Sequence, residues 1–510
     1  MTARRRKVWA KALTVIVLFC LAAWFTDCDI SQFWARKGHL TDIIVRMIPP
    51  SWGYLGSILS PLLATLQMSV TGTGLGAFLA LLLAPLCARN LPAPAPVRVV
   101  LRFLVQVLRS FPALILALLA TFLFGLGTFA GTVAITVYTM AIMTRLTYED
   151  IETLPLGPYH ALTAMGVSPA RACFRAVVPD IAPGYLTNAL YLLETNVRHS
   201  AILGYVGAGG IGLLLNEKIS WLEYDKVGMI LLCLFATVCV IETVSHALGR
   251  IVRGEVRVSR RSKRILIAGA VVCFVWCTVT LSGPDFSHVS LTAVKRMLSG
   301  FIHPDWAFFF RTDSGGLGYL LLETVCIALV GTVLGAVLAI PLAFLGTPKL
   351  VPAPVALVFR VLVMAIRSVP FLIYGLIFIR VSGPGAFTGV LTLSLCSVGL
   401  LTKRFTEAIE ALDFRAYNAL AAMGVSPVLR VRYAILPQLA PAFASAVLYR
   451  FDVNIREASV LGLVGAGGIG APLIFAMNQY NWSTAGAICL GLILLVWVID
   501  LLSARIRKSA

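Results

Sequence analysis

The sequence predicts an all-α polytopic membrane protein of about twelve transmembrane helices, built as two parallel six-helix repeats. Composition supports the membrane class. Of the 510 residues, 59% are hydrophobic and 13% are charged, and the mean hydropathy is +0.90. Soluble domains carry about 25% charged residues, roughly twice as many. The apolar residues gather in runs of about 20, the length that crosses a hydrocarbon core of about 30 Å.

An internal repeat predicts the twofold organisation. ALTAMGVSP at 161–169 recurs as ALAAMGVSP at 419–427, and LGYVGAGGIG at 203–212 recurs as LGLVGAGGIG at 461–470. Both recurrences lie 258 residues further along the chain, so the block between them aligns without a gap. We expect a first repeat at 1–253, a basic cytoplasmic linker at 254–264 and a second repeat at 265–510.

Each repeat contains six apolar spans. In the first repeat they lie at 8–25, 58–87, 98–125, 127–146, 180–204 and 227–249. In the second repeat they lie at 265–283, 317–346, 355–381, 384–402, 438–462 and 483–503. Six spans return the chain to its starting side. The two repeats therefore have the same orientation and are related by a pseudo-twofold axis along the membrane normal.

The basic residues predict which side faces the cytoplasm. They cluster beside apolar runs at the start, in the linker and at the end: Arg4, Arg5, Arg6, Lys7, Lys11; Arg250, Arg253, Arg257, Arg260, Arg261, Lys263, Arg264; Arg505, Arg507, Lys508. This is the positive-inside pattern. It explains the net charge of +19 without nucleic-acid binding and predicts a multi-pass protein of the bacterial inner membrane with cytoplasmic N- and C-termini.

The opening of the chain resembles a signal peptide, because a basic stretch precedes an apolar one in 1–24. The second repeat opens in the same way at 254–281, so we interpret the first apolar stretch as a retained helix. Eleven cysteines lie mostly inside apolar runs, no CxxC pair occurs and the six histidines are scattered. These patterns favour buried small side chains over disulfides or a metal site.

A patterned loop follows the fourth span of each repeat, at 147–178 and 403–436. In both copies Ala-Met is followed by a glycine (Gly166, Gly424) and then by Ser-Pro, which predicts the end of one short helix and the start of another. A pair of short helices that occurs in both repeats would suit a soluble partner that is itself a twofold dimer. The alternative is an interfacial helix that only anchors the loop.

Several motifs resemble those of a known family. A-L-x-A-M-G-V-S-P followed by Val178-Pro179 or Leu436-Pro437 is similar to the EAA loop of bacterial ABC importer permeases. EAIEALD at 407–413, YRFDVNIREASVLGLVGAGGIG at 449–470 and AMNQYNW at 476–482 resemble the phosphonate importer permeases more narrowly. RSxP, at 109–112 and 367–370, and GAGG are shared with methionine importer permeases, which keeps that substrate open. The first copy departs from the pattern, with Pro155 where the second has Asp413.

The resemblance implies a type I ABC importer permease with two permease units fused in one chain. Its cargo would be phosphonate or a related phosphorus oxyanion (phosphate, phosphite), moved by alternating access. The implied partners are homodimeric ABC ATPase subunits in the cytoplasm and a periplasmic or lipid-anchored phosphonate-binding protein. ATP and Mg would belong to the ATPase, and the whole complex would be a phosphonate-transporting ATPase. This chain has no GxxxxGK[ST] phosphate cradle, because lysine follows glycine nowhere, so we expect no enzyme activity and no cofactor in it.

The resemblance also assigns the loop to ATPase coupling, with its helix in a groove of the ATPase. The residues assigned to coupling are Glu149, Glu152, Ala161, Ala164, Gly166, Glu407, Glu410, Ala419, Ala422 and Gly424. The GAGGIG runs satisfy GxGxxG literally, but each follows a membrane span rather than a strand, so we interpret them as tight turns. The resemblance places these turns at the outer gate: Gly207, Gly209, Gly210, Gly212, Gly465, Gly467, Gly468 and Gly470.

Ionisable residues inside the spans are expensive and mark candidate path positions. Arg109 and Arg367 lie about eleven residues into the third spans, which is roughly the midplane. Arg198 and Arg456 lie in the fifth spans, each four residues after an acid (Glu194, Asp452), so a structural ion pair remains an alternative. Guanidinium groups bind oxyanions bidentately. The predicted path residues are Arg109, Ser110, Asn196, Arg198, Arg367, Ser368, Asn454 and Arg456.

Two other classes remain as alternatives. An ion-coupled secondary transporter would also show repeats and buried charges, but it predicts mid-membrane carboxylates without basic neighbours. A membrane anchor without transport activity would not need arginines repeated in both halves.

Overall fold

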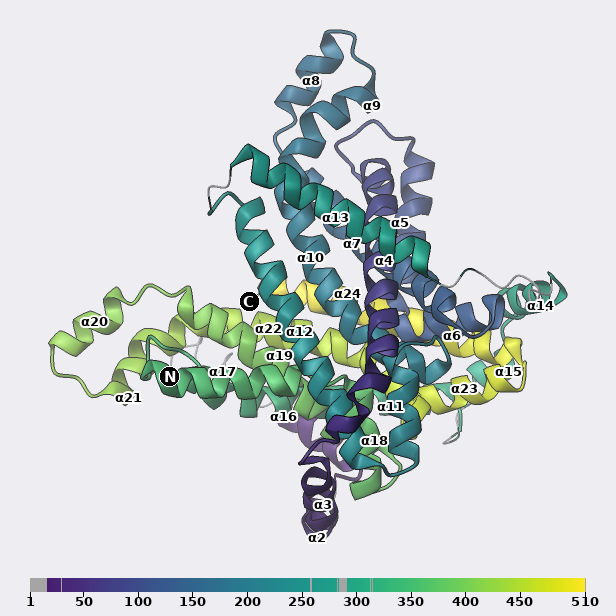
Figure 1. Cartoon of the computed structure of the whole chain (residues 1–510), viewed down its shortest axis with the longest axis vertical. Coiled ribbons are helices and arrows are strands. Elements are labelled where there is room, and N and C mark those ends of the chain that lie inside the picture. The colour runs from purple at the N-terminus through teal and green to yellow at the C-terminus, as the bar shows by residue number, and fades with distance from the viewer. Residues whose placement is uncertain are drawn as a thin grey trace. The chain divides into compact units, whose positions relative to one another are not determined.

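A computed structural model describes residues 16–28, 30–256, 259–281, 283, 291–311, 313 and 315–509. Within these ranges the chain forms helices and loops without a strand (Figure 1), which confirms the all-α prediction. The start of the first expected span, the N-terminal basic cluster and Arg257 lie outside the described residues, as do residues 284–290, 312 and 314 between the seventh and eighth spans.

The chain packs into two compact units, one formed by residues 45–295 and the other by 296–509 together with 16–44. These boundaries differ from those of the sequence repeats, because the first helix of each repeat packs within the other repeat's unit. Helix α13 (Arg260–Thr280) packs on α4 (Leu55–Cys87). The ring of Phe25, in helix Ile16–Phe25, lies 5.2 Å from that of Tyr319 in α16 (Leu317–Leu345). The duplication of sequence and the units of packing are therefore different divisions of the chain.

Helices follow one another in the same order in both units. After α2 (Ile30–Ala35) and α3 (Lys37–Met47), the 45–295 unit contains η1 (Trp52–Tyr54), α4, α5 (Ala95–Ser110), α6 (Ala113–Phe124), α7 (Thr128–Thr153), α8 (Gly157–Ala164), α9 (Pro169–Ala172), η2 (Cys173–Val177), α10 (Val178–Leu203), η3 (Gly204–Val206), α11 (Ile211–Ser220), α12 (Tyr224–Val252) and α13. After α14 (Leu291–Ile302), the 296–509 unit contains α15 (Trp306–Phe309), α16, α17 (Ala353–Ser368), α18 (Phe371–Ser382), α19 (Ala386–Glu410), α20 (Arg415–Ala422), α21 (Pro427–Arg430), η5 (Val431–Ile435), α22 (Leu436–Leu461), η6 (Gly462–Val464), α23 (Gly470–Asn478) and α24 (Trp482–Ser509).

Eight helices of the described residues are long and apolar enough to cross a membrane, and two bent helix pairs raise the number to as many as ten. The other two expected spans correspond to α10 and to helix Ile16–Phe25. Helix α10 has 26 residues, enough to span, but it contains Asp180, Glu194 and Arg198 and is too polar for the same criterion.

The third span of each repeat is not the straight helix that the sequence led us to expect. Helices α5 and α6 meet at 97°, and α17 and α18 meet at 86°. The cause is the proline of each RSxP motif. It has no amide hydrogen, and it forces the preceding residue, Phe111 or Val369, into an extended conformation. Arg109 and Arg367 therefore occupy the last turn before a break and not the middle of one continuous helix, and their depth in the membrane stays a prediction.

Glycines bring α4 against α7 and α16 against α19. A Cβ atom on Gly76 would lie 2.6 Å from the carbonyl oxygen of Thr136, and one on Gly335 would lie 2.4 Å from Cβ of Ser397. Each glycine follows another by four residues (Gly72, Gly331), the GxxxG spacing that lets helices approach closely in membranes. These glycines recur after 259 residues instead of 258, so the segment between them and the RSxP motif is one residue longer in the first repeat.

Candidate translocation and coupling site

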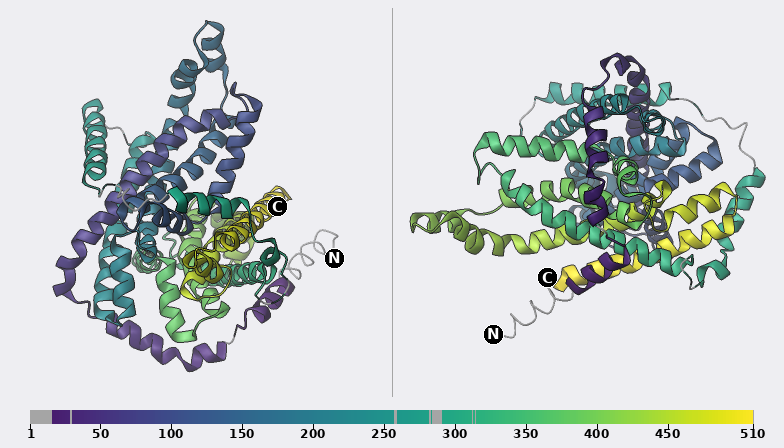
Figure 2. Two further views of the ribbon diagram at one scale, coloured as in Figure 1. Left: turned by 90° about the vertical axis from the view of Figure 1, so that its right-hand side faces the viewer. Right: turned by 90° about the horizontal axis from the view of Figure 1, so that it is seen from below.

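Two pairs of short helices project from the bundles, as the loop pattern predicted. We call residues 157–172 (α8, α9) and 415–430 (α20, α21) the projecting hairpins. Figure 1 shows each hairpin beyond the ends of the long helices that it connects, and Figure 2 shows the first from the side, at the top of its left panel. Gly166 and Gly424 turn the chain at φ of +82° and +75°, which confirms the predicted helix stops. The second helix of each hairpin begins at the proline of Ser-Pro.

The small residues assigned to coupling lie together on the exposed surface of these hairpins. Each is more than one-third exposed, and beside them Met165 and Met423 are 76% and 75% exposed. The opposite face contacts the bundle, where Leu162 packs against a buried cluster. The exposed residues of this set are Ala161, Ala164, Gly166, Ala419, Ala422 and Gly424. Their contact with an ATPase stays a prediction.

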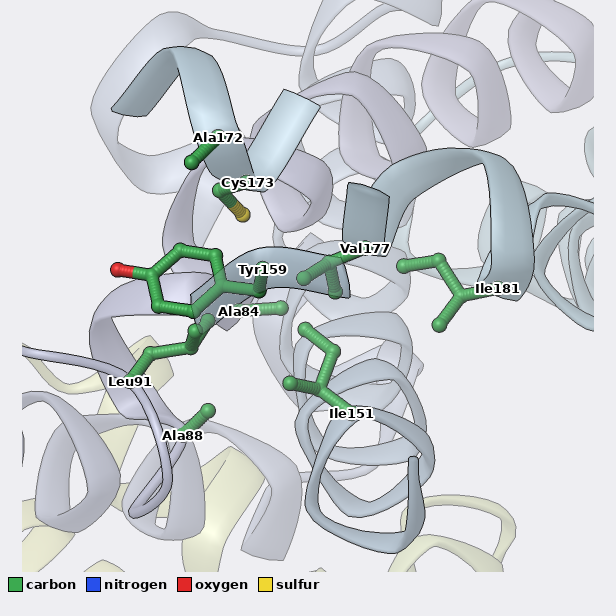
Figure 3. Close-up of a cluster of buried hydrophobic side chains, with 9 residues drawn as sticks. All are labelled: Ala84, Ala88, Leu91, Ile151, Tyr159, Ala172, Cys173, Val177 and Ile181. Carbon is green, nitrogen blue, oxygen red and sulfur yellow. The ribbon is translucent and has the colours of Figure 1, made fainter. Parts of the chain in front are cut away.

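A hydrophobic cluster anchors the base of the first hairpin (Figure 3). Tyr159 of α8 is 3% exposed and packs with side chains from the ends of α4 and α7, from η2 and from the start of α10. In the other unit, Phe405 of α19 is stacked on Phe443 of α22 with ring centroids 3.9 Å apart, and Tyr417 of α20 packs at the edge of that cluster. Each hairpin is therefore attached to the bundle through an apolar core.

The four acids assigned to coupling lie on the ends of α7 and α19, before the hairpins, and have partners within the chain. Glu152 binds Arg102, and Glu410 binds Arg360. Glu149 accepts a 2.8 Å bond from Arg145, and Glu407 lies 3.5 Å from Arg404. A direct contact of these acids with an ATPase stays a prediction.

The predicted path residues fall into two environments. Arg109 and Arg367 lie one residue before the ends of α5 and α17. The hydroxyls of the next residues donate to carbonyls of their own helices, Ser110 to Gln106 O at 2.9 Å and Ser368 to Ala365 O at 2.8 Å. In the fifth spans, Arg198 Nη1 lies 2.8 Å from Glu194 Oε1, and Arg456 Nη2 lies 2.8 Å from Asp452 Oδ2. The predicted i,i+4 ion pairs are thus confirmed.

The two asparagines of the fifth spans cross-link their bundles. Asn196 is fully buried and donates 2.8 Å bonds to Thr73 of α4 and Thr139 of α7. Asn454 makes the corresponding bonds to Thr332 at 2.6 Å and Ser397 at 2.9 Å. The structure therefore places both asparagines inside a bundle, and a role for them in the path stays a prediction.

Sequence reasoning missed a buried ion pair that only the second repeat contains. Arg450 is 3% exposed and donates to both carboxylate oxygens of Glu457, at 3.3 and 2.7 Å, and to Ser397 at 3.1 Å. The corresponding residues of the first repeat are Leu192 and His199. Opposite charges seven residues apart lie on one helix face, and this spacing is the signal that would have revealed the pair.

The GAGGIG runs form the tight turns that we expected. Gly207, Gly209 and Gly210 have φ between +73° and +81°. Their counterparts Gly465, Gly467 and Gly468 lie within the same range. Gly212 and Gly470 instead allow a close approach, since a Cβ atom would lie 2.1 Å from Ala201 O and 2.4 Å from Ser459 O. These turns follow helices, and no strand precedes them in the described residues, unlike a dinucleotide-binding loop.

Threonines of α4 and α16 hold these turns from the side. Thr65 Oγ1 accepts a 2.8 Å bond from the amide of Ile211, and Thr324 Oγ1 accepts a 3.1 Å bond from that of Ile469. The second turn also lies beside an acid, because a Cβ atom on Gly467 would come 3.1 Å from Glu323 Oε1. The first repeat has Ala64 at the corresponding position.

Comparison with known proteins identifies the family. The sequence signature described as "Binding-protein-dependent transport system inner membrane component" matches residues 72–258 and again 331–509. The chain belongs to this family. Each match contains one projecting hairpin, one ion-paired fifth span and one glycine turn, so each repeat is one inner-membrane component unit. As a member, the chain is the permease of a binding-protein-dependent importer, and works with a substrate-binding protein and an ATPase.

Named relatives of this permease are similar over different lengths. It is 30% identical over 497 residues to the phosphate-import permease protein PhnE of Mycolicibacterium smegmatis, which covers 96% of this chain and 92% of the relative. It is 39% identical over 189 residues to the phosphite transport system permease protein PtxC of Stutzerimonas stutzeri, covering 37% and 69%. A probable D-methionine permease, MetI of Vibrio cholerae, is 27% identical over 162 residues, covering 30% and 72%.

Proposed function

We propose that this permease imports phosphonate or a related phosphorus oxyanion, such as phosphate or phosphite, by ATP-driven alternating access. The observation that carries the proposal is the similarity to a phosphate-import permease over 96% of the chain, which includes both repeats. The higher identity to a phosphite permease over a shorter stretch supports the same substrate class.

The two hairpins would each dock on one subunit of a homodimeric ABC ATPase. Their exposed small residues allow a partner to approach closely, and their apolar bases connect them to the spans. In this arrangement the hairpins, the linker and both termini face the cytoplasm, as the basic residues favour. The glycine turns then face the periplasm and the phosphonate-binding protein, and ATP and Mg act on the ATPase alone.

Arginines would receive the oxyanion along the path. The guanidinium fork matches the geometry of phosphorus oxyanions. The fifth-span arginines already bind carboxylates, so an incoming oxyanion would exchange with Glu194 or Asp452 and would not meet an uncompensated charge. Exchange between two acceptors permits release as well as binding, which a path requires.

The rival substrate is methionine. Its supporting similarity is weaker, at 27% identity over 30% of the chain. Methionine is a zwitterion and would use the acids of the fifth spans as well as the arginines. The two substrates therefore predict different effects when Glu194 and Asp452 become glutamine. Loss of these acids weakens methionine transport and leaves binding of an oxyanion intact.

The deciding experiment reconstitutes the chain in proteoliposomes with candidate ATPases and binding proteins. We expect phosphonate, phosphate or phosphite, delivered by its binding protein, to stimulate ATP hydrolysis and to enter the vesicles. Uptake of methionine without uptake of any phosphorus oxyanion would overturn the substrate class. Uptake driven by a proton or sodium gradient without ATP would overturn the importer mechanism.

A further inference from the structure

An arginine–glutamate contact occurs at the same place in both repeats. Arg102 of α5 binds Glu152 in the last turn of α7, and Arg360 of α17 binds Glu410 in the last turn of α19. The first pair is about three-quarters buried, with side-chain exposures of 20% and 26%, and the second is more open at 44% and 38%. Each contact joins the helix before the RSxP break to the helix before the hairpin.

Each arginine also joins a third helix. Arg102 Nε donates a 2.7 Å bond to the carbonyl of Cys87 at the end of α4, and Arg360 Nε donates a 2.8 Å bond to Gly346 O at the end of α16. Each guanidinium thus links the middle of its own helix to the ends of two others. A lysine could not reproduce this link, because its ammonium group is a single point of contact.

Further bonds reinforce the glutamate side of both contacts. The amide of Arg89 donates a 2.9 Å bond to Glu152 Oε1, and Lys349 Nζ donates a 2.7 Å bond to the carbonyl of Glu410. The surroundings differ, because Arg102 lies over the ring of Tyr148, whereas the corresponding residue of the second repeat is Thr406. The arginine–glutamate–carbonyl arrangement is therefore what the two repeats share.

The contact lies between the hairpin and the broken span. Ile151, next to Glu152, belongs to the cluster that holds Tyr159 of the hairpin (Figure 3). Displacement of the hairpin moves this cluster and with it the end of α7. Arg102 then transmits the movement to α5, whose last turn carries Arg109 at the break.

We propose that Arg102–Glu152 and Arg360–Glu410 are coupling clamps, which convert hairpin displacement into movement of the broken third span. The two arginines are positioning residues and need not touch substrate or ATPase. This inference rests on the proposed ATP-driven mechanism and adds to it the route by which the ATPase acts on the path. The second pair is exposed to solvent and contributes little to the free energy of unfolding, so Arg360→Gln should leave the fold intact. The first pair is more buried, so thermal unfolding of the Arg102→Gln variant is measured beside its transport activity.

The test uses the reconstituted complex with its ATPase and binding protein. In a variant with Arg102→Gln and Arg360→Gln, we expect ATP hydrolysis to continue while substrate uptake per ATP falls by about tenfold, the size of a typical coupling between sites. The Arg→Lys pair of substitutions should give an intermediate value. The matched control is Glu255→Gln, which removes an exposed ion pair with Arg253 and should change nothing.

Two further measurements make the result decisive. Charge exchange in both repeats (Arg102→Glu with Glu152→Arg, Arg360→Glu with Glu410→Arg) should restore part of the uptake per ATP. If the pairs were needed only for folding, the exchange would restore the yield of protein and leave uptake per ATP unchanged. Hydrogen exchange on the unsubstituted complex should change in residues 95–110 together with 157–164 when ATP binds.

Normal uptake per ATP in the glutamine variant would overturn the clamp, and so would an ATP response confined to the hairpin. The proposed function fails separately, if the unsubstituted complex hydrolyses ATP but imports no phosphorus oxyanion. In that case the clamp is still tested by comparing how far the binding protein stimulates ATP hydrolysis in the unsubstituted complex and in the glutamine variant.

Discussion

The ion pair Arg450–Glu457 shows how much free energy of unfolding one substitution can remove when it leaves a charge without its partner. The side chain of Arg450 is 3% exposed and that of Glu457 is 16% exposed, so the arginine is almost entirely removed from water and depends on the carboxylate for compensation. Removing one partner of a buried pair costs about 3–5 kcal/mol, because the remaining charge has no compensation. Replacing both partners by residues that pack well costs much less.

The first repeat supplies the substitution that tests this difference. We predict that Arg450→Leu alone lowers the free energy of unfolding by about 3 kcal/mol. The double change to Leu at 450 and His at 457, the residues at the corresponding first-repeat positions, should recover most of that loss. Thermal unfolding of the purified chain in detergent measures both. Equal destabilisation by the single and double variants would contradict the pairing argument.

Close approach at the glycine turns gives a second residue-scale prediction. Gly212 has an ordinary helical φ, but a methyl group would lie 2.1 Å from Ala201 O, so the start of α11 must move away from α10. We expect Gly212→Ala to destabilise the chain by about 1–3 kcal/mol, as overpacking does. Gly125→Ala is an unsuitable control because its φ is +80°, whereas Gly56→Ala on α4 meets nothing within 4 Å and should be neutral.

At the scale of elements, the projecting hairpins depend on a turn that only glycine makes without strain. Gly166 and Gly424 have left-handed φ, with open space around each Cβ position, so a substitution acts through the backbone alone. We predict that Gly166→Val with Gly424→Val lets ATP hydrolysis proceed while transport falls by about tenfold or more. Gly157→Ala, in open space with ordinary φ, should keep both activities.

Uptake and hydrolysis measured side by side in proteoliposomes distinguish these outcomes. Full transport by the double valine variant would show that the shape of the hairpin turn is irrelevant to coupling. Equal loss of transport and hydrolysis in the glycine-to-alanine control would show that the hairpin as a whole tolerates no change.

Much of the element pattern was predictable because it depends on local signals. Apolar runs located the spans, and Gly-Val-Ser-Pro located both hairpins. The breaks at Pro112 and Pro370 were missed because the surrounding residues are apolar enough to read as one continuous span. Arg450–Glu457 was missed because its spacing of seven residues exceeds the three or four at which helical ion pairs usually form. The partners of Glu152 lie 50 and 63 residues away, where no local pattern reaches.

At the scale of the whole molecule, the boundaries of the sequence repeats differ from those of the packing units. No local signal indicates that α13 packs on α4, where the ring of Phe274 covers Gly74. Gln67 of α4 also donates a 2.8 Å bond to Thr280 of α13. The linker therefore joins α12, the last helix of the first repeat, to α13, the first helix of the second repeat, and both helices belong to the 45–295 unit.

This packing predicts how the chain tolerates being cut. Fragments 1–256 and 257–510, expressed together, should assemble, because the cut falls between α12 and α13 and breaks no helix. Fragment 1–256 alone should be less stable than fragment 1–281, because only the longer fragment retains α13, which packs on α4. Co-purification and thermal unfolding test the two statements. Equal stability of 1–256 and 1–281 would contradict the packing.

The first repeat has Leu192 and His199 at the sequence positions that correspond to Arg450 and Glu457, and this difference has a consequence for how such a chain can change. In an assembly of two identical subunits every substitution is inherited by both halves at once. A single polypeptide that contains both halves escapes that restriction, and here one half has an ion pair where the other has neutral residues. Each repeat can therefore vary independently, so the two repeats can come to perform different tasks.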